Sequence, residues 1–202
     1  MPVMTASTRP KTRRERQEET RQALLDAAKA VVARRGIEGA SHREIAAEAG
    51  VTIGAIYANF SNKADLIVSV LEDTNRDGTM LTADSPTVAA CLEDLGHRLV
   101  EQADSQPELT VLSVEFALAS IRDPQIRERR LPHREAEHAA YADVLERIAA
   151  RSGEKLPMPA ADFVEVIANL GWSLLITRAM LGADVITEEF VVRALALLIQ
   201  EA

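Results

Sequence analysis

The sequence predicts an all-α fold. Alanine, leucine, glutamate and arginine are abundant among its 202 residues, whereas aromatic residues make up only 3%. This residue supply favours helices over strands. Apolar residues recur at intervals of three and four along most of the chain, and prolines stand at the starts of several of these segments, where a helix tolerates them. With 47% hydrophobic and 27% charged residues, the chain has the composition of a protein that folds.

The first periodic segment begins near Glu15. Residues 1–14 are polar and basic with almost nothing apolar to bury, which predicts a flexible basic arm. From Glu15 onward, apolar residues recur at helical spacing up to the cations Arg34 and Arg35, and Gly36 follows them. Cations in a last turn and a glycine just beyond it are typical of a helix end. A first helix is therefore expected from Glu15 to about Gly36.

Two short helices joined by a glycine turn come next. Ser41 followed by Glu44 is a reciprocal capping pair, so a second helix is expected to begin at Ser41 and to run only to Ala49. Gly50 supplies the left-handed residue of a tight turn, and Thr52 starts a third short helix. A helix, a glycine turn and a second short helix form a helix-turn-helix, which lays its second helix in the major groove of DNA.

The residue types of this segment suit that use. Five apolar side chains can face one small core: Ile45, Ala49, Val51, Ile56 and Phe60. Thr52, Ile53 and Ala55 then lie on the opposite face, where they are free to meet base edges.

The rest of the chain predicts longer helices. A fourth helix is expected after Ser61 and through Leu71. Beyond Asp77 and Gly78, helices are expected near 86–103, 107–121, 124–151, 160–181 and 188–200.

Charge is distributed unevenly between the two parts of the chain. Residues 1–63 hold 11 Lys and Arg against seven Asp and Glu, whereas residues 64–202 hold 12 against 24, and the whole chain has a net charge of -8. Attraction to phosphate depends on charge within roughly 10 Å at moderate salt. The basic N-terminal part can therefore approach DNA despite the acidic remainder.

Cysteine content and hydropathy favour a cytoplasmic protein without a membrane partner. Cys91 is the only cysteine and cannot form an internal disulfide, and no secretory signal pattern is evident. The most apolar stretch, 164–181, contains Glu165, Asn169 and Arg178, which favours a buried helix over a membrane span.

The segment between Leu24 and Leu71 resembles the tetracycline-repressor (TetR) family of bacterial regulators. The resemblance is carried by more than a dozen positions in register: Glu38-Gly39-Ala40-Ser41, Glu44-Ile45-Ala46, Ala49-Gly50-Val51, Gly54, Ile56-Tyr57, Asn59-Phe60, Lys63 and Leu66. It implies a DNA-binding transcriptional regulator, a repressor that a small-molecule ligand releases from a pseudo-palindromic operator. The implied organisation is an arm at 1–14, a three-helix DNA-binding domain at 15–63 and a larger ligand-binding and dimerisation domain at 64–202.

The resemblance also implies positions that touch DNA. Contacts to the backbone or base edges are implied for Ser41, Arg43, Tyr57, Asn59 and Lys63. Thr52, Ile53 and Ala55 fall where family members read bases, and their methyl groups suit thymine. Ile53 and Ala58 depart from the polar or basic residues usual there, so sequence reading would depend on Arg43, Thr52, the basic arm or DNA shape.

For the C-terminal part, the resemblance implies a homodimer through the last two long helices and a pocket for a small effector. Both helices carry apolar residues around most of their circumference, and a partner chain is the simplest cover for them. The pocket candidates are Glu115, Phe116, His133, His138, Tyr141, Trp172, Ile176 and Met180.

Two other functions stay open at this stage. A carboxylate-bridged di-metal enzyme needs carboxylate and histidine pairs on facing helices, and the candidates are Glu135 with His138, Asp94 with His97, and Glu115 and Glu165. A helical protein-interaction scaffold would leave the basic N-terminal part without a role. The sequence has no phosphate-binding glycine loop, nucleophile elbow or HExxH motif, so no catalytic residue, metal or cofactor is expected.

Overall fold

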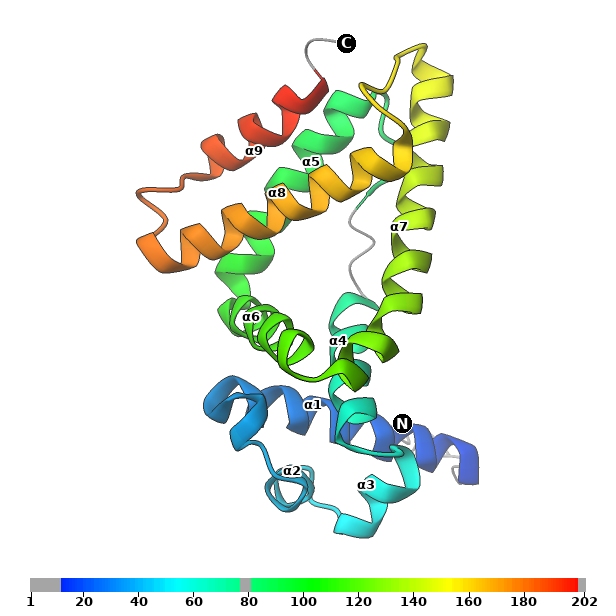
Figure 1. The fold of residues 1–202 in the computed structure, drawn as a ribbon, viewed down its shortest axis with the longest axis vertical. Coiled ribbons are helices and arrows are strands. Elements are labelled where there is room, and N and C mark those ends of the chain that lie inside the picture. The colour runs from blue at the N-terminus through cyan, green and yellow to red at the C-terminus, as the bar shows by residue number, and fades with distance from the viewer. Residues whose placement is uncertain (1–11, 77–80, 200–202) are drawn as a thin grey trace, which may run out of the picture.

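The computed structural model describes residues 12–76 and 81–199, which form helices joined by short loops and contain no strand (Figure 1). The all-α prediction is confirmed. The helices are α1 (Arg13–Gly39), α2 (His42–Glu48), α3 (Ile53–Asn59), α4 (Lys63–Arg76), α5 (Val88–Ser105), α6 (Pro107–Arg122), α7 (Pro124–Ser152), α8 (Ala160–Leu181) and α9 (Glu188–Ala196), which a 3-10 turn (Leu197–Ile199) extends.

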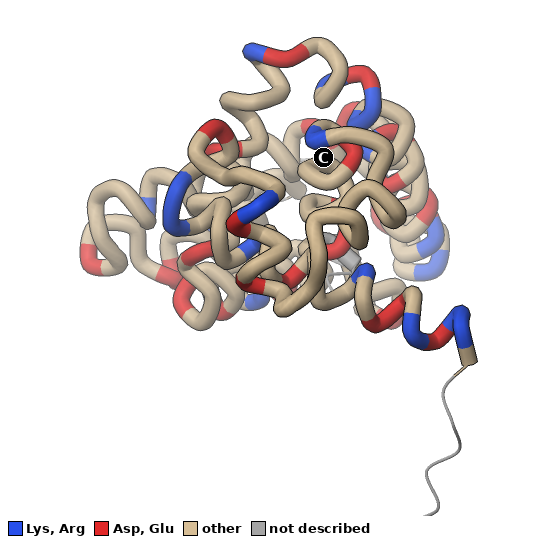
Figure 2. The backbone as a smooth tube through the Cα atoms, turned by 90° about the horizontal axis from the view of Figure 1, so that it is seen from below, with Lys and Arg blue, Asp and Glu red and all other residues tan. Residues whose placement is uncertain are grey.

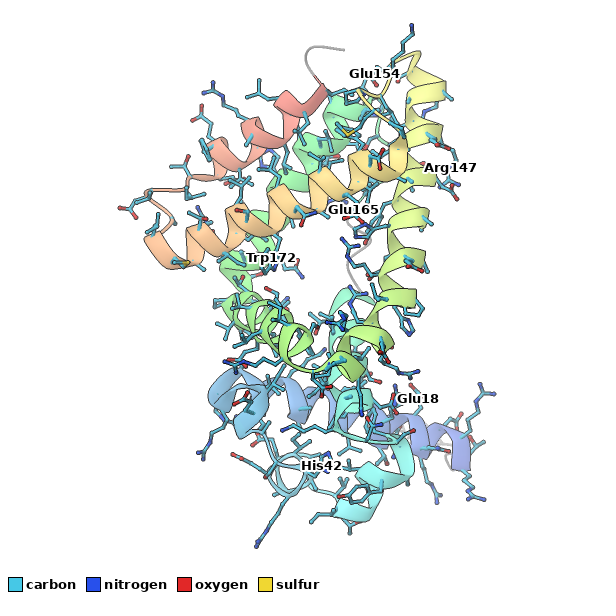
Figure 3. All side chains as sticks on the ribbon, viewed as in Figure 1. Glu18, His42, Arg147, Glu154, Glu165 and Trp172 are labelled. Carbon is cyan, nitrogen blue, oxygen red and sulfur yellow. The ribbon has the colours of Figure 1, made fainter. Side chains whose placement is uncertain are left out.

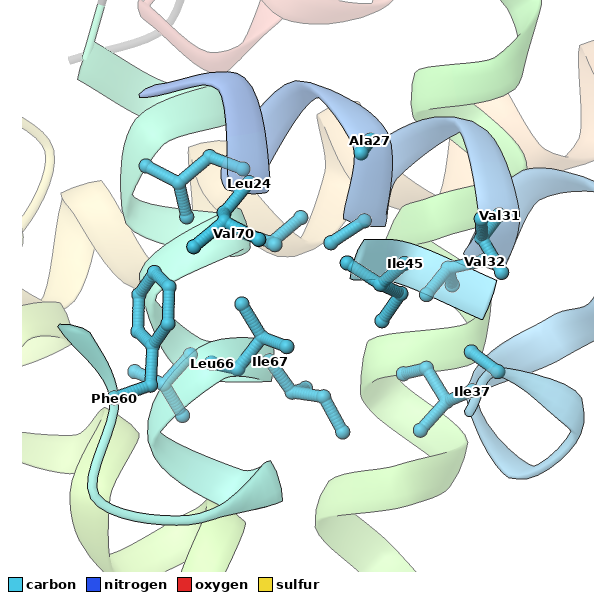
Figure 4. Packing of buried hydrophobic residues seen from close by; sticks show 14 of the residues in the cluster. Leu24, Ala27, Val31, Val32, Ile37, Ile45, Phe60, Leu66, Ile67 and Val70 are labelled. Carbon is cyan, nitrogen blue, oxygen red and sulfur yellow. The ribbon is translucent and has the colours of Figure 1, made fainter. Parts of the chain in front are cut away.

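The helices form two packed groups. Figure 1 shows α1, α2 and α3 at one end of the molecule and α5, α8 and α9 at the other, with α7 along one side. One apolar cluster joins α1–α4 and includes Leu112 and Phe116 from α6 and Ile126 from α7; Figure 4 shows its central part. A second cluster joins α5, α7, α8 and α9. The N-terminal helices therefore share a core with α6 rather than standing apart from the rest.

The first helix is longer at both ends than the sequence predicts. Thr12 caps it by accepting the Glu15 N–H at 3.2 Å, so α1 starts at Arg13 and takes up Arg13 and Arg14, which were expected in the arm. Residues 1–11 of the predicted arm lie outside the described residues. At the other end, Gly36 adopts φ +71°, which kinks the helix without ending it, and one more turn follows to Gly39.

The other helices lie close to their predicted ranges. α5 starts at Val88, two residues late, because Thr87 caps it by accepting the Ala90 N–H at 3.1 Å. Asn62 rather than Ser61 caps α4, since its side chain accepts the Asp65 N–H at 2.8 Å. Among the described helices, α8 is long and apolar enough to cross a membrane by those two criteria alone, and it packs against α5, α6, α7 and α9.

Candidate DNA interface and effector cavity

The turn between α2 and α3 is set by hydrogen bonds that close the end of α2. Gly50 N–H donates to the Ala47 carbonyl at 3.2 Å, and Val51 N–H donates to the Ala46 carbonyl at 2.9 Å. This pair of bonds is a Schellman motif, which needs a left-handed residue, and Gly50 has φ +67°. The motif fixes the angle at which α3 leaves α2.

The small core predicted for the helix pair is present. Ile45, Ile56 and Phe60 are buried, while Ala49 and Val51 pack against them and are partly buried. From α1, the Arg21 guanidinium lies 4.6 Å above the centre of the Phe60 ring and donates to the Asn59 carbonyl and to Ser69 Oγ. These contacts hold the end of α3 against α1.

The opposite face carries the residues expected to meet DNA. Ser41, Arg43, Thr52 and Ile53 are exposed, and Ala55 is partly buried. Ser41 caps α2 by accepting the Glu44 N–H at 3.2 Å, so its hydroxyl already has a local partner.

The cations at this face have no carboxylate partner. The acidic residues of α2 pair with α1, since Glu44 binds Arg35 at 3.3 Å and Glu48 binds Arg34 at 2.8 Å. Within the described residues, neither Arg43 nor the α4 residue Lys63 makes an ion pair, so both are available to phosphate. Seen from below in Figure 2, further Lys and Arg residues mark the start of α1, beside the grey N-terminal trace.

Tyr57 projects from α3 with 63% of its surface exposed, so it does not pack in the small core. Its hydroxyl lies 3.3 Å from Nδ1 of His42 at the start of α2, and the two rings meet edge to face with centroids 5.4 Å apart. His42 therefore holds the Tyr57 ring upright on the exposed face; sequence reasoning missed this contact because α2 and α3 bring the two residues together. Asn59, by contrast, is partly buried, and its amide donates to the Ala55 carbonyl of the same helix at 2.8 Å.

The start of α4 is held by a compact polar cluster. Asp65 accepts the Ser61 N–H at 2.8 Å and pairs with Arg129 of α7 at 2.8 Å. Burial on its own raises the pKa of Asp65, but the Ser61 hydrogen bond and the Arg129 charge outweigh burial and hold the pKa below its ordinary value. Lys63, next to this cluster, is thereby positioned at a helix N-terminus, where free N–H groups favour a phosphate.

A cavity of about 530 Å³ lies among α4, α5, α6, α7 and α8. Four of the predicted pocket residues line it: Phe116, His138, Tyr141 and Trp172. Figure 3 places Trp172 on the side of α8 that faces α6. A volume of this size is in the range of roughly 300–1,000 Å³ that is typical of small-molecule sites.

The other four predicted pocket residues lie elsewhere. Glu115 faces α1, where its carboxylate accepts the Ile37 N–H at 3.0 Å. His133 Nε2 lies 2.8 Å from Glu72 Oε1 of α4. Met180 is 76% exposed on α8, and Ile176 is partly exposed on the same helix.

The cavity also contains charged residues of α7 that sequence reasoning missed. Arg130 donates to Glu137 at 3.0 Å, and Arg134 donates to both carboxylate oxygens of Glu165, at 2.8 and 2.5 Å. The Arg134 hydrogen bonds hold the pKa of Glu165 below its ordinary value. The spacing of Arg130, Arg134 and His138 along one helix was the available signal, since residues four apart share a face.

Two buried residues of the N-terminal core also line the cavity. Leu112 and Phe116 of α6 line the cavity and also belong to the apolar cluster of α1–α4. On the neighbouring face of α6, Glu115 binds the kink of α1, and Arg122 pairs with Glu38 at 2.7 Å. A displacement of α6 by an occupant of the cavity would therefore reach α1 directly.

The geometry does not favour a di-metal site. Glu115 is committed to the α1 backbone, and His97 Nδ1 lies 2.6 Å from Glu188 on α9. Across residues 12–76 and 81–199, no group of three or more His, Cys, Asp or Glu residues is arranged to hold a metal ion.

Comparison with known proteins supports a regulatory function. The family model for bacterial regulatory proteins of the tetR family matches residues 24–70. The HTH-type transcriptional repressor SCO4008 of Streptomyces coelicolor is 32% identical over 165 residues, which cover 80% of this chain and 81% of that protein. The nicotine-responsive transcriptional repressor HdnoR of Paenarthrobacter nicotinovorans is 30% identical over 130 residues, or 61% of this chain and 62% of that one.

Solved structures agree on the fold. Salmonella enterica GusR superimposes with a TM-score of 0.73 at 19% identity, and the match covers 90% of this chain and 95% of that one. At this level of identity, the likeness extends to the helical architecture.

Proposed function

Because this chain belongs to the TetR family of bacterial transcriptional regulators, we propose that it is a cytoplasmic repressor that binds a pseudo-palindromic operator as a homodimer and leaves it when a small molecule occupies the cavity. The chain is a DNA-binding transcriptional regulator. Repression, dimerisation and release by an effector are the parts that we propose. The single observation that carries the response to an effector is the cavity beside Leu112 and Phe116, whose side chains also pack into the core of the DNA-binding helices.

A surface of α8 and α9 supports the homodimer. On α8, five residues spaced by four and three share one face: Val166, Leu170, Ser173, Thr177 and Met180. Val166, Ser173 and Met180 are exposed, whereas Thr177 is partly buried and Leu170 packs partly against the core. On α9 and its 3-10 extension, Phe190, Ala194 and Leu197 repeat the same spacing, and Phe190 and Leu197 are 51% and 59% exposed. Such a repeat forms the seam of paired helices, so two copies of this surface suit a four-helix interface.

The two-fold axis of such a dimer has a consequence for the operator. Two copies of α3 would enter major grooves about one DNA turn, roughly 34 Å, apart or somewhat more. Two DNA-binding domains related by a two-fold axis require half-sites of opposite orientation, so the operator is expected to be a pseudo-palindrome.

The position of α6 supports the response to an effector. A ligand shifts a two-state protein only by its difference in affinity for the two states, and couplings of about 1–3 kcal/mol are typical. Because α6 both lines the cavity and contacts α1, a bound ligand can directly favour one position of the DNA-binding helices over another. Response to a small molecule is stated in the name of the relative HdnoR.

The test is selection of bound sequences from random double-stranded DNA, followed by titration of the selected sequence by fluorescence anisotropy at several salt concentrations. We expect two inverted half-sites and an affinity that falls steeply with salt. A double variant Arg43→Ala/Lys63→Ala should lose most of this affinity, whereas Arg147→Ala, exposed on α7, should retain it. Absence of any salt-sensitive affinity in a folded sample would refute the proposal.

A further inference from the structure

The cavity has one charged wall. Within the described chain, every charged residue that lines it comes from α7, in a stripe of one helical face formed by Arg130, Arg134, Glu137, His138 and Tyr141. The facing walls are mainly apolar and come from α5, α6 and α8: Leu95, Leu99, Leu112, Phe116, Val164, Ile167, Trp172 and Leu175. A ligand that fits this cavity is therefore polar at one side and apolar over the rest.

The charged wall contains more hydrogen-bond donors than acceptors. The side chain of Arg130 is only 18% exposed and donates one hydrogen bond, to Glu137. Arg134 donates two, both to Glu165, which does not itself line the cavity. A guanidinium has five N–H donors, so among the described residues each arginine retains donors beyond these bonds.

The balance of charge points in the same direction. Arg130 pairs with Glu137 and Arg134 with Glu165, but of these two carboxylates only that of Glu137 lines the cavity, so the cavity surface has two guanidinium groups and one carboxylate. A partly buried cation with unused donors is stabilised by an anion, and the planar fork of arginine matches a carboxylate with two parallel hydrogen bonds.

We propose that the effector is an amphipathic carboxylic acid, with its carboxylate on Arg130 and Arg134 and its apolar body against Phe116, Ile167 and Trp172. This inference rests on the proposed role of the cavity as the effector site. A cationic amphiphile of the same shape is disfavoured, because its ammonium would face the two guanidinium groups at the polar wall.

Trp172 provides the measurement, since it is the only tryptophan of the chain and lines the cavity. The full-length protein is titrated, without DNA, with decanoate, decan-1-ol and decylammonium, and the tryptophan fluorescence is followed. The three probes share an apolar chain and differ in the head group. We expect decanoate to bind about tenfold more tightly than decan-1-ol, because a charge-assisted hydrogen bond is roughly twice as strong as a neutral one. Equal affinities, a preference for decylammonium, or no fluorescence change with decanoate overturns the proposal.

Variants then locate the carboxylate. Arg130→Gln should weaken decanoate binding about tenfold and leave decan-1-ol unchanged, as expected for the loss of one charged contact. Arg130→Lys keeps the charge but not the planar guanidinium, so its affinity for decanoate should lie between those of wild type and Arg130→Gln. This variant also provides the test if Arg130→Gln does not fold. Arg147→Gln is the control, since Figure 3 shows Arg147 on α7 away from the cavity. Equal loss for decanoate and decan-1-ol in both Arg130 variants would exclude a carboxylate contact there.

Operator binding is measured separately, so the two proposals can fail independently. A protein that binds its operator but shows no preference for decanoate refutes the ligand class and leaves the regulator intact. Preference for decanoate without any effect on operator affinity supports the ligand class and refutes the effector role of the cavity.

Discussion

The Glu115 carboxylate on α6 accepts the backbone N–H of Ile37 at the kink of α1, at 3.0 Å. Gly36, the residue at the kink, has φ +71°, and a Cβ built there would lie 3.1 Å from both Glu115 oxygens. At the kink, the Ile37 N–H thus faces the carboxylate of Glu115 on α6, a helix that lines the cavity. This contact connects the proposed effector site with the first helix of the DNA-binding domain.

Replacing Glu115 with alanine should destabilise the protein by about 1–3 kcal/mol, because the partly buried Ile37 N–H loses its acceptor. Glu115→Gln retains an acceptor oxygen and should lose less. Urea denaturation measures both, with Glu101→Ala, an exposed acid of α5, as the control. Stability of Glu115→Ala equal to that of the control would show that the contact contributes nothing.

Two glycines of the DNA-binding domain should respond to alanine in opposite directions. Gly50 has φ +67° with open space around it, so Gly50→Ala should cost roughly 1–2 kcal/mol from backbone strain alone. Gly54 lies in α3 without positive φ, and a Cβ there meets only Thr52 Oγ1 at 3.7 Å. Gly54→Ala should therefore stabilise the protein by about 0.5–1 kcal/mol. Thermal or urea unfolding gives the sign of each change, and the same sign for both would contradict a left-handed conformation confined to Gly50.

Lys63 and Tyr57 should weaken DNA binding in distinguishable ways. Lys63→Ala removes a charge, so affinity should fall for all sequences alike and the slope of log affinity against log salt should decrease by about one. Tyr57→Phe removes a neutral hydroxyl, so affinity should fall while the slope stays the same. Anisotropy titrations at four salt concentrations separate the two effects. An unchanged slope for Lys63→Ala would remove this residue from the phosphate contacts.

The contact between Asp65 and Arg129 should make stability dependent on acid. The folded state holds the pKa of Asp65 below its ordinary value of 3.8, so the carboxylate stabilises the fold above that value. This contribution is lost as the pH falls through the lowered pKa. Between about pH 5 and pH 3, wild type should therefore lose more stability than Asp65→Asn. Parallel pH profiles for the two proteins would assign the acid sensitivity to other groups.

A charge in the middle of the α8 seam should disrupt the proposed dimer. Light scattering coupled to gel filtration is expected to give a dimer for wild type and a monomer for Ser173→Glu, because the carboxylate would be buried without a partner. Ala161→Glu, exposed on another face of α8, is the matched control and should remain dimeric. A wild-type monomer at micromolar concentration would refute the interface.

The helices were largely predictable because their ends are encoded locally. Prolines at the first positions of α6 and α7 and the serine cap of α2 act within a few residues of themselves. Gly36 shows where local reasoning fails, because a left-handed residue ends a helix in most contexts, whereas here one further turn packs against α6. The sequence therefore predicted the left-handed conformation of Gly36 correctly, but not that the helix would continue beyond it.

The candidate sites were predictable to different degrees for a similar reason. The helix-turn-helix is a continuous segment, so its exposed and buried faces follow from spacing alone. The cavity is assembled from five helices, and the rotation of each one is set by its packing against the others. Glu115 and Phe116 are neighbours in sequence, yet about 100° apart around α6, so one faces α1 and the other the cavity.

Leu112 and Phe116 both line the cavity and pack in the core of α1–α4, which constrains how such a protein can change its ligand specificity. Any substitution at these positions changes the shape of the cavity and also changes the packing of the DNA-binding helices against α6. New inducers are therefore more readily accommodated by changes on α7 and α8, whose cavity-facing side chains lie outside the cluster of α1–α4. Directed evolution for altered recognition would be expected to accumulate its substitutions on those two helices and to spare α6.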